Sequence, residues 1–172
     1  TGSTGYGFRD NNGTMEFANI NGGWNQFTMA TTGPSFSVNK NNSDQSVSTA
    51  VATKLTWSTE LFDTNNNFAS DKFTPTVPGK YIFYLNLYCS NSTDNCGALI
   101  YKNGSFANGL YTRTAAAMAS VTVILDMNGT TDYVEAYGYT NGGTIISGST
   151  AYTYFTGAMI APVNGNNAAG WA

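Results

Sequence analysis

The stretch DKFTPTVPGKYIFYLNLY, residues 71–88, decides how this chain folds. It contains a Pro-Gly turn at residues 78–79, and the residues that follow point alternately to the two faces of a β-strand. The odd positions from 81 to 87 are apolar or aromatic, and so are most of the even positions from 82 to 88. An antiparallel strand with one face in water should alternate apolar with polar residues. The stretch therefore predicts a strand that is covered on both faces.

The composition of the whole chain agrees with a β-rich fold. Its 172 residues are enough for one domain with its own hydrophobic core. Only 10% of them are charged, against about 25% in an average domain, while 14% are aromatic. Apolar segments recur from residue 36 to residue 162 between turns rich in Asn, Gly, Ser and Asp. This spacing, without helical periodicity, predicts an all-β jelly-roll sandwich of about ten strands.

Residues 5–27 predict a separate small β-hairpin element. Two short strand candidates flank the turn signal DNNG, and NINGG marks a second turn. So few strands cannot bury both of their faces, so the element should pack on the main domain or on copies of itself. We expect an N-terminal hairpin or stalk-connecting element at 1–33, a jelly-roll head at 34–163 and a tail at 164–172.

Charge and composition exclude several classes of function. The net charge is −3 and there is no run of basic residues, so nucleic-acid binding is not expected. No apolar stretch approaches the ~20 residues that span a bilayer, so membrane insertion is not expected either. The chain starts with TGSTGYG, without a signal peptide or an initiator methionine, and we expect a fragment or a processed product.

The sequence offers no catalytic constellation, and we predict that the protein is not an enzyme and binds no cofactor. It has no histidine, no G-x-S-x-G and no S-x-x-K motif. Its carboxylates are scattered, mostly in turns. Glu135 lies in a strand, where we expect it to pair with a lysine or a tyrosine hydroxyl. Asp126 and Asp132 in DMNGTTD are conceivable calcium ligands, but the segment fits a turn better.

Cys89 and Cys96 flank the segment SNSTDN. A hairpin would bring them within disulfide range. A bridge is expected in a secreted chain, whereas both remain thiols in a virion assembled in a reducing cytosol. The sequence leaves these two possibilities open.

Three further strand candidates, 120–126, 132–139 and 153–161, also carry apolar or aromatic residues on both faces. One sandwich would leave several of these second faces wet. A contiguous exposed apolar patch usually marks an interface. The alternative is that loops of the same chain or the N-terminal element cover them.

The ordered motifs of the chain resemble the globular heads of complement's q component. KFTPTVPGKYIFYLNLY resembles the signature strand of that family, and ALIYKNG resembles its strand that ends in Lys-Asn-Gly. VILDMNGTTDYVEAY and YFTGAMIAP resemble its later strands, although the turn in the former is lengthened. The likeness covers residues 36–162.

The resemblance implies a homotrimer. Members of the family, like tumour necrosis factor, are ten-stranded jelly rolls that trimerise about a threefold axis, so two neighbouring copies would cover the second face. The residues implied near the axis are Tyr84, Tyr137, Tyr139, Tyr154, Ala158 and Ile160. The residues implied in the core of each protomer are Phe73, Tyr81, Phe83, Val134, Phe155 and Met159. A twofold dimer is the alternative.

Residues 7–27, GFRDNNGTMEFANINGGWNQF, are similar to short segments that precede receptor-binding tips in bacteriophage fibre and tail proteins. We therefore expect a homotrimeric head of a phage virion fibre or appendage that attaches to a host surface glycan or protein receptor and joins other virion or stalk proteins. One alternative is a secreted or surface-displayed bacterial head on a collagen-like stalk, of which GSTG at residues 2–5 would be the last triplet. Another is a cytokine-like trimeric signalling ligand.

Overall fold

The computed structural model of the chain describes residues 7–18, 23–26, 33–90, 95–113, 118–142 and 144–162. The chain divides into two compact units, residues 1–32 and residues 33–172. The expected tail at 164–172 lies outside the described residues. Within the part of the chain that is described, no helix is long and apolar enough to cross a membrane.

The smaller unit is an antiparallel sheet in the order β1-β2-β3, formed by Gly7–Asn11, Thr14–Ala18 and Trp24–Gln26. The turn between β1 and β2 has positive φ at Asn12 (52°) and Gly13 (83°). Two such residues give the turn a twist that matches the flanking strands, which explains the Asn-Gly pair. The predicted hairpin is confirmed, with β3 added at its edge.

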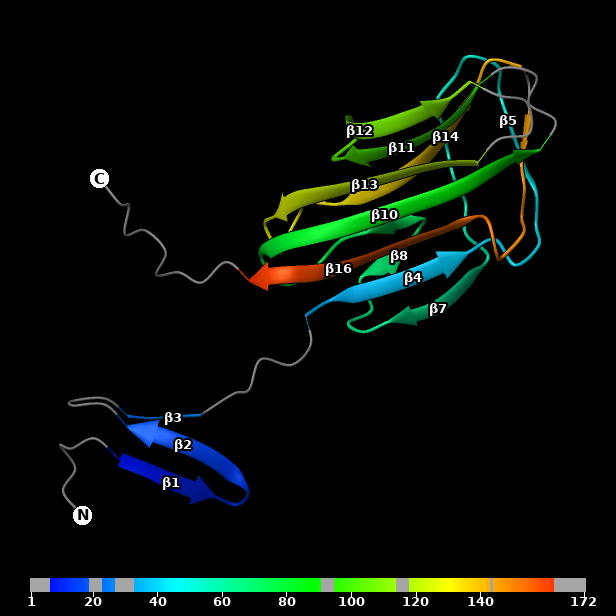
Figure 1. The fold of residues 1–172 in the computed structure, drawn as a ribbon. Coiled ribbons are helices and arrows are strands. Elements are labelled where there is room, and N and C mark those ends of the chain that lie inside the picture. Colours follow the sequence, from blue (N-terminus) through cyan, green and yellow to red (C-terminus); the bar gives the residue numbers. More distant parts are fainter. Residues whose placement is uncertain are drawn as a thin grey trace, which may run out of the picture. The chain divides into compact units, whose positions relative to one another are not determined.

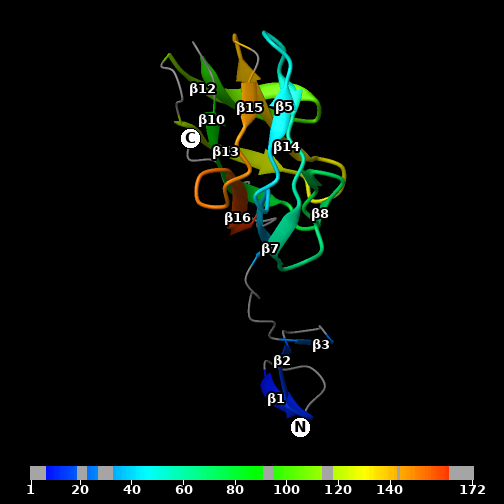
Figure 2. The same cartoon turned by 90° about the vertical axis from the view of Figure 1, so that its right-hand side faces the viewer.

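The larger unit is a sandwich of two antiparallel sheets, shown from two sides in Figures 1 and 2. The first sheet has the order β5-β15-β10-β16-β4-β7, with β13 paired to β10. Its strands are β4 (Ser35–Asn39), β5 (Gln45–Val47), β7 (Thr59–Asp63), β10 (Gly79–Ser90), β13 (Met118–Met127), β15 (Thr144–Ile146) and β16 (Tyr154–Pro162). The second sheet has the order β12-β11-β14-β9-β8, with β6 paired to β14. Its strands are β6 (Thr53–Lys54), β8 (Phe68–Ala69), β9 (Lys72–Phe73), β11 (Cys96–Lys102), β12 (Ser105–Thr112) and β14 (Val134–Thr140).

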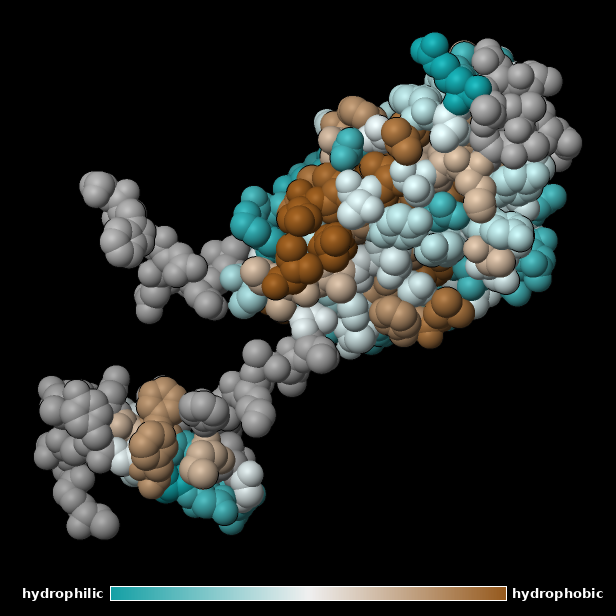
Figure 3. Space-filling view, in the orientation of Figure 1, coloured by the Kyte–Doolittle hydropathy of each residue, from teal (hydrophilic) through white to brown (hydrophobic). Residues whose placement is uncertain are grey.

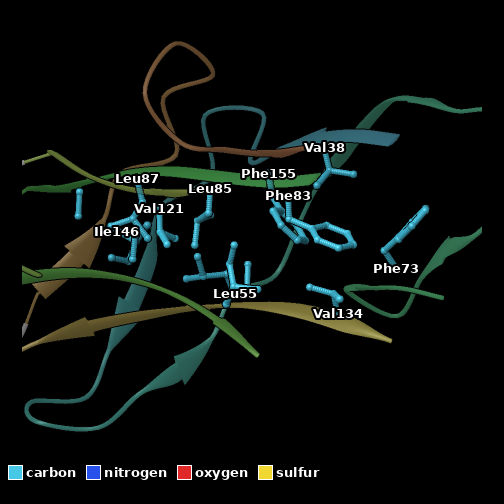
Figure 4. Packing of buried hydrophobic residues seen from close by; sticks show 14 of the residues in the cluster. Val38, Leu55, Phe73, Phe83, Leu85, Leu87, Val121, Val134, Ile146 and Phe155 are labelled. Carbon is cyan, nitrogen blue, oxygen red and sulfur yellow. The ribbon is translucent and has the colours of Figure 1, made fainter. Parts of the chain in front are cut away.

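The core lies between the sheets and is rich in phenylalanine (Figure 4). Phe36 packs among these rings, and the centroid of its ring lies 4.4 Å from that of Phe73 and 4.9 Å from that of Phe155. Gly157 makes room for this cluster, because a Cβ there would lie 2.7 Å from the ring of Phe83. Of the six residues predicted to fill the core, five are fully buried and Met159 packs against the cluster while partly buried. The predicted all-β sandwich is confirmed.

Lys40 is the one lysine of the described residues that is almost completely buried, at 1% exposed. Its ammonium group donates to Oε1 of Gln45 at 2.6 Å and to the carbonyl of Thr56 at 2.8 Å. Burial lowers the pKa of Lys40 from 10.5 to about 8, although the carboxylates of Asp71 and Asp44 act to raise it. The fold thus holds a desolvated ammonium group next to two neutral acceptors.

Stability should therefore rise between pH 8 and about pH 10. In this window Lys40 keeps its proton in the unfolded chain, where its pKa is 10.5, and loses it in the folded chain. The rise in pH therefore stabilises the folded chain, by at most about 3 kcal/mol. Burial raises the pKa of Tyr81 from 10.0 to about 12, so above pH 10 the unfolded chain loses this proton before the folded chain does, and stability falls. We expect thermal unfolding from pH 7.5 to 9.5 to show the rise in the native chain and not in Lys40→Met. Equal slopes in both proteins would contradict the assignment.

Cys89, near the end of β10, and Cys96, at the start of β11, form a buried disulfide with a Cα–Cα distance of 5.7 Å. The bridge ties a strand of the first sheet to a strand of the second. The bridge keeps these two segments close together in the unfolded chain, so less conformational entropy is lost when the two sheets pack.

The double variant Cys89→Ala/Cys96→Ala should lose about 2–3 kcal/mol of unfolding free energy, because a short closed loop is released in the unfolded chain. Urea unfolding at fixed protomer concentration measures the loss. Dithiothreitol should weaken the native chain by a similar amount and leave the double variant unchanged. A native chain insensitive to reduction of this bond contradicts the prediction.

Candidate oligomer interface

The outward face of the first sheet carries a cluster of apolar and aromatic side chains. We call it the apolar face, and its residues are Ile82, Tyr84, Ile124, Tyr154, Ala158 and Ile160. Figure 3 shows a brown, hydrophobic area over the neighbouring strands β13, β10 and β16. Ile124 is 55% exposed and Ile160 is similar, while Tyr84, Tyr154 and Ala158 are half-buried by their neighbours.

Strand register brings these side chains together. Ile82 on β10 pairs with Ile124 on β13 and with Ala158 on β16, so three apolar side chains form a row across the sheet. Residues directly opposite on one face lie about 4.5–5.5 Å apart at Cβ. Two positions further along β10, Tyr84 lies between threonines of the same two strands.

Tyr84 and Tyr154 form an aromatic pair on this face. Their ring centroids are 5.7 Å apart and the rings are tilted by 42°. Partial burial raises the pKa of the Tyr154 hydroxyl, and a hydrogen bond with Tyr84 raises it further. The raised pKa keeps the Tyr154 hydroxyl neutral, so this hydroxyl adds hydrogen-bonding capacity to the face without adding charge.

The charged groups lie at the end of the face where β10 begins. Lys80 Nζ and Asp126 Oδ1 form an exposed ion pair at 2.7 Å. Lys102 Nζ donates to the carbonyl of Asp126 at 2.6 Å. An apolar centre with charges only at its margin is the usual layout of a protein interface.

The residues predicted near the axis do not all lie on this face. Tyr84, Tyr154, Ala158 and Ile160 do. Tyr137 and Tyr139 belong to β14, which pairs with β11 in the second sheet, so they point outward from the opposite side of the sandwich. The structure therefore does not bring them together with the other four, because alternation along a strand shows which residues share a face but not which sheet the strand joins. Which of the six lie at a trimer interface stays a prediction. Ile82 and Ile124 were missed, although the same alternation marked them.

The carboxylates considered for chemistry serve structural roles. Glu135 Oε1 pairs with Lys54 Nζ at 2.7 Å, and the Tyr137 hydroxyl lies 3.5 Å from Oε2, which confirms the predicted pairing. Asp132 closes the turn after β13. It accepts from Asn103 Nδ2 at 2.7 Å, which lowers its pKa, and pairs with Lys102 at 2.9 Å. Among the described residues no group of three His, Cys, Asp or Glu side chains could hold a metal ion.

The sheet orders and the packing define the jelly roll of complement-q heads and tumour-necrosis-factor-like proteins. The globular domain of zebrafish complement 1qA is 18% identical, and the match covers 75% of this chain and 98% of that domain with a TM-score of 0.59. Murine APRIL is 10% identical over 74% of this chain and 99% of its own, with a TM-score of 0.60. PRD1 vertex protein P5 is 13% identical over 78% of this chain and 100% of its own, with a TM-score of 0.55.

At these identities the likenesses establish the fold, and the predicted resemblance is confirmed at that level. No protein-family model matches the sequence, and no curated protein sequence matches it either. The similarity of residues 7–27 to phage fibre segments stays a prediction.

Proposed function

We propose that the chain is a non-enzymatic homotrimeric head that attaches its carrier to a surface. The observation that supports the proposal best is the apolar face: an exposed, uncharged surface that crosses three neighbouring strands of the first sheet. Fully burying a large apolar side chain contributes about 1.5–3 kcal/mol. Several such residues in each protomer supply enough free energy for a stable oligomer after the cost of association is subtracted.

A closed trimer fits this function because it presents three equal recognition surfaces. Weak contacts at each of them add up when all three can engage one target. The carrier that we favour is a bacteriophage fibre or appendage, since a virion vertex protein, PRD1 P5, has the same fold. The three-stranded sheet of residues 7–26 would then connect the head to a stalk or particle.

Two experiments test the proposal. Light scattering of the purified chain should give the mass of three protomers, and a stable monomer at micromolar concentration would refute the trimer. The genes around the coding sequence then separate the carriers. Tail or capsid genes support the virion, Gly-x-y triplets ahead of Thr1 support a bacterial stalk, and a secretion signal or membrane anchor supports a signalling ligand.

A further inference from the structure

The outward face of the second sheet carries a cluster of aromatic rings. We call it the tyrosine face, and its residues are Tyr101, Phe106, Tyr111, Tyr137 and Tyr139. They come from the three adjacent strands β11, β12 and β14. The rings of Tyr101 and Tyr137 are stacked with centroids 4.1 Å apart, and Phe106 meets Tyr101 edge-on at 5.9 Å. Tyr111 and Tyr139 form a perpendicular pair at 5.2 Å.

Small and apolar residues of β11 let the rings lie close to the backbone of the sheet. A Cβ at Gly97 would lie 2.7 Å from the ring of Tyr111, so only glycine lets that ring approach the backbone. Leu99, on the same side of β11, is buried although it is outside the core cluster. Phe106 remains 57% exposed and Tyr111 46% exposed. The result is a fixed layer of aromatic surface that is open to solvent.

The polar groups of the tyrosine face are neutral or compensated. The carboxylate of Glu135 on β14 pairs with Lys54 on β6. The hydroxyl of Tyr139 donates to Oδ1 of Asn141 at 2.7 Å. The polar groups at the rings are thus the phenol hydroxyls and the amide of Asn141, and the carboxylate among them is paired.

The tyrosine face and the apolar face belong to different sheets of the sandwich. Sheets of a sandwich pack about 10 Å apart, and these two faces point in opposite directions. A threefold axis next to the apolar face would therefore not run along the tyrosine face. If the trimer of the proposed function forms, it displays three tyrosine faces.

We propose that the tyrosine face binds neutral saccharides; the inference rests on the proposed attachment function and specifies its partner. The C–H face of a pyranose ring is apolar and weakly positive, and the face of an aromatic ring is negative, so the two stack. The hydroxyl groups of the sugar meet the phenol and amide groups around the rings. Because the rings are already fixed by one another, binding costs little side-chain entropy. A flat, uncharged site of this kind suits a polysaccharide chain better than a charged partner.

Surface plasmon resonance of the full chain on immobilised dextran, mannan, galactan, xylan and acidic alginate tests the proposal. We expect binding to at least one neutral polysaccharide, and binding at least about tenfold weaker for Phe106→Ala and for Tyr111→Ala. Tyr152→Ala is the matched control, since Tyr152 is the same residue type, is 47% exposed and contacts Tyr88 rather than the tyrosine face. Its binding should equal that of the native chain.

Three results would overturn the inference: no binding to any neutral polysaccharide, binding to alginate alone, or an equal loss in all three variants. Light scattering on the same samples separates this failure from that of the proposed function. A trimer that binds no neutral polysaccharide removes only the saccharide assignment and points to a protein receptor. A monomer that still binds through Phe106 and Tyr111 removes the trimer and keeps the tyrosine face.

Discussion

Replacing Tyr84 by aspartate is expected to reduce the solution mass from three protomers to one. Tyr84 lies at the middle of the apolar face, where its ring meets that of Tyr154. The carboxylate would lose its water on assembly and find no cationic partner on this face, which costs several kcal/mol for each copy. The three carboxylates would also repel one another around the axis. Size-exclusion chromatography with light scattering at micromolar concentration measures the change.

The matched control is Tyr139→Asp. It makes the same chemical change on the outward face of the second sheet, so the trimer should persist. Ile124→Lys is a second disruptive variant at an exposed position that does not contribute to the core. Circular dichroism must show folded chains in all three cases. If Tyr139→Asp dissociates the assembly and Tyr84→Asp does not, the outward face of the second sheet forms the interface, and the assignment of the apolar face is wrong.

The contrast between Tyr84 and Tyr139 shows what the sequence could and could not predict. Both tyrosines alternate with core residues, so the sequence indicated that each points away from the core. The sheet to which each belongs depends on pairing between distant strands: β10 with β13 and β16, and β14 with β11. Such pairing is set by the packing of the whole domain and leaves no signal in a single strand.

Local features, in contrast, were predictable. Both residues have a positive φ in the Asn12-Gly13 turn and in the Asn103-Gly104 turn. A two-residue hairpin turn requires this conformation, and Asn and Gly adopt it readily. Lys40 was not predicted, because the segment around it reads as a polar turn. It is buried only because Gln45 and the Thr56 carbonyl, from later in the chain, meet its ammonium group. The tyrosine face was missed for a similar reason, since its rings come from three strands.

Replacing Phe36 by alanine is expected to lower the unfolding free energy by about 3–5 kcal/mol, the cost of emptying a large aromatic site in a core. The ring of Phe36 is fully buried and lies within 6.4 Å, centroid to centroid, of Phe68, Phe73, Phe83 and Phe155. These rings come from both sheets, so they cannot collapse into the cavity without moving the layers. Domains of this kind have total stabilities of about 5–15 kcal/mol, so the loss is a large share.

Urea unfolding measures this loss, and the protomer concentration must be the same for all variants because assembly adds to apparent stability. Phe106→Ala is the control: it removes the same side chain from an exposed position and should cost less than about 1 kcal/mol. Combining Phe36→Ala with Tyr84→Asp separates the two contributions. If the core and the interface are independent, the two losses add within about 0.5 kcal/mol. A loss at Phe36 no larger than that at Phe106 would mean that the aromatic cluster does not hold the sheets together.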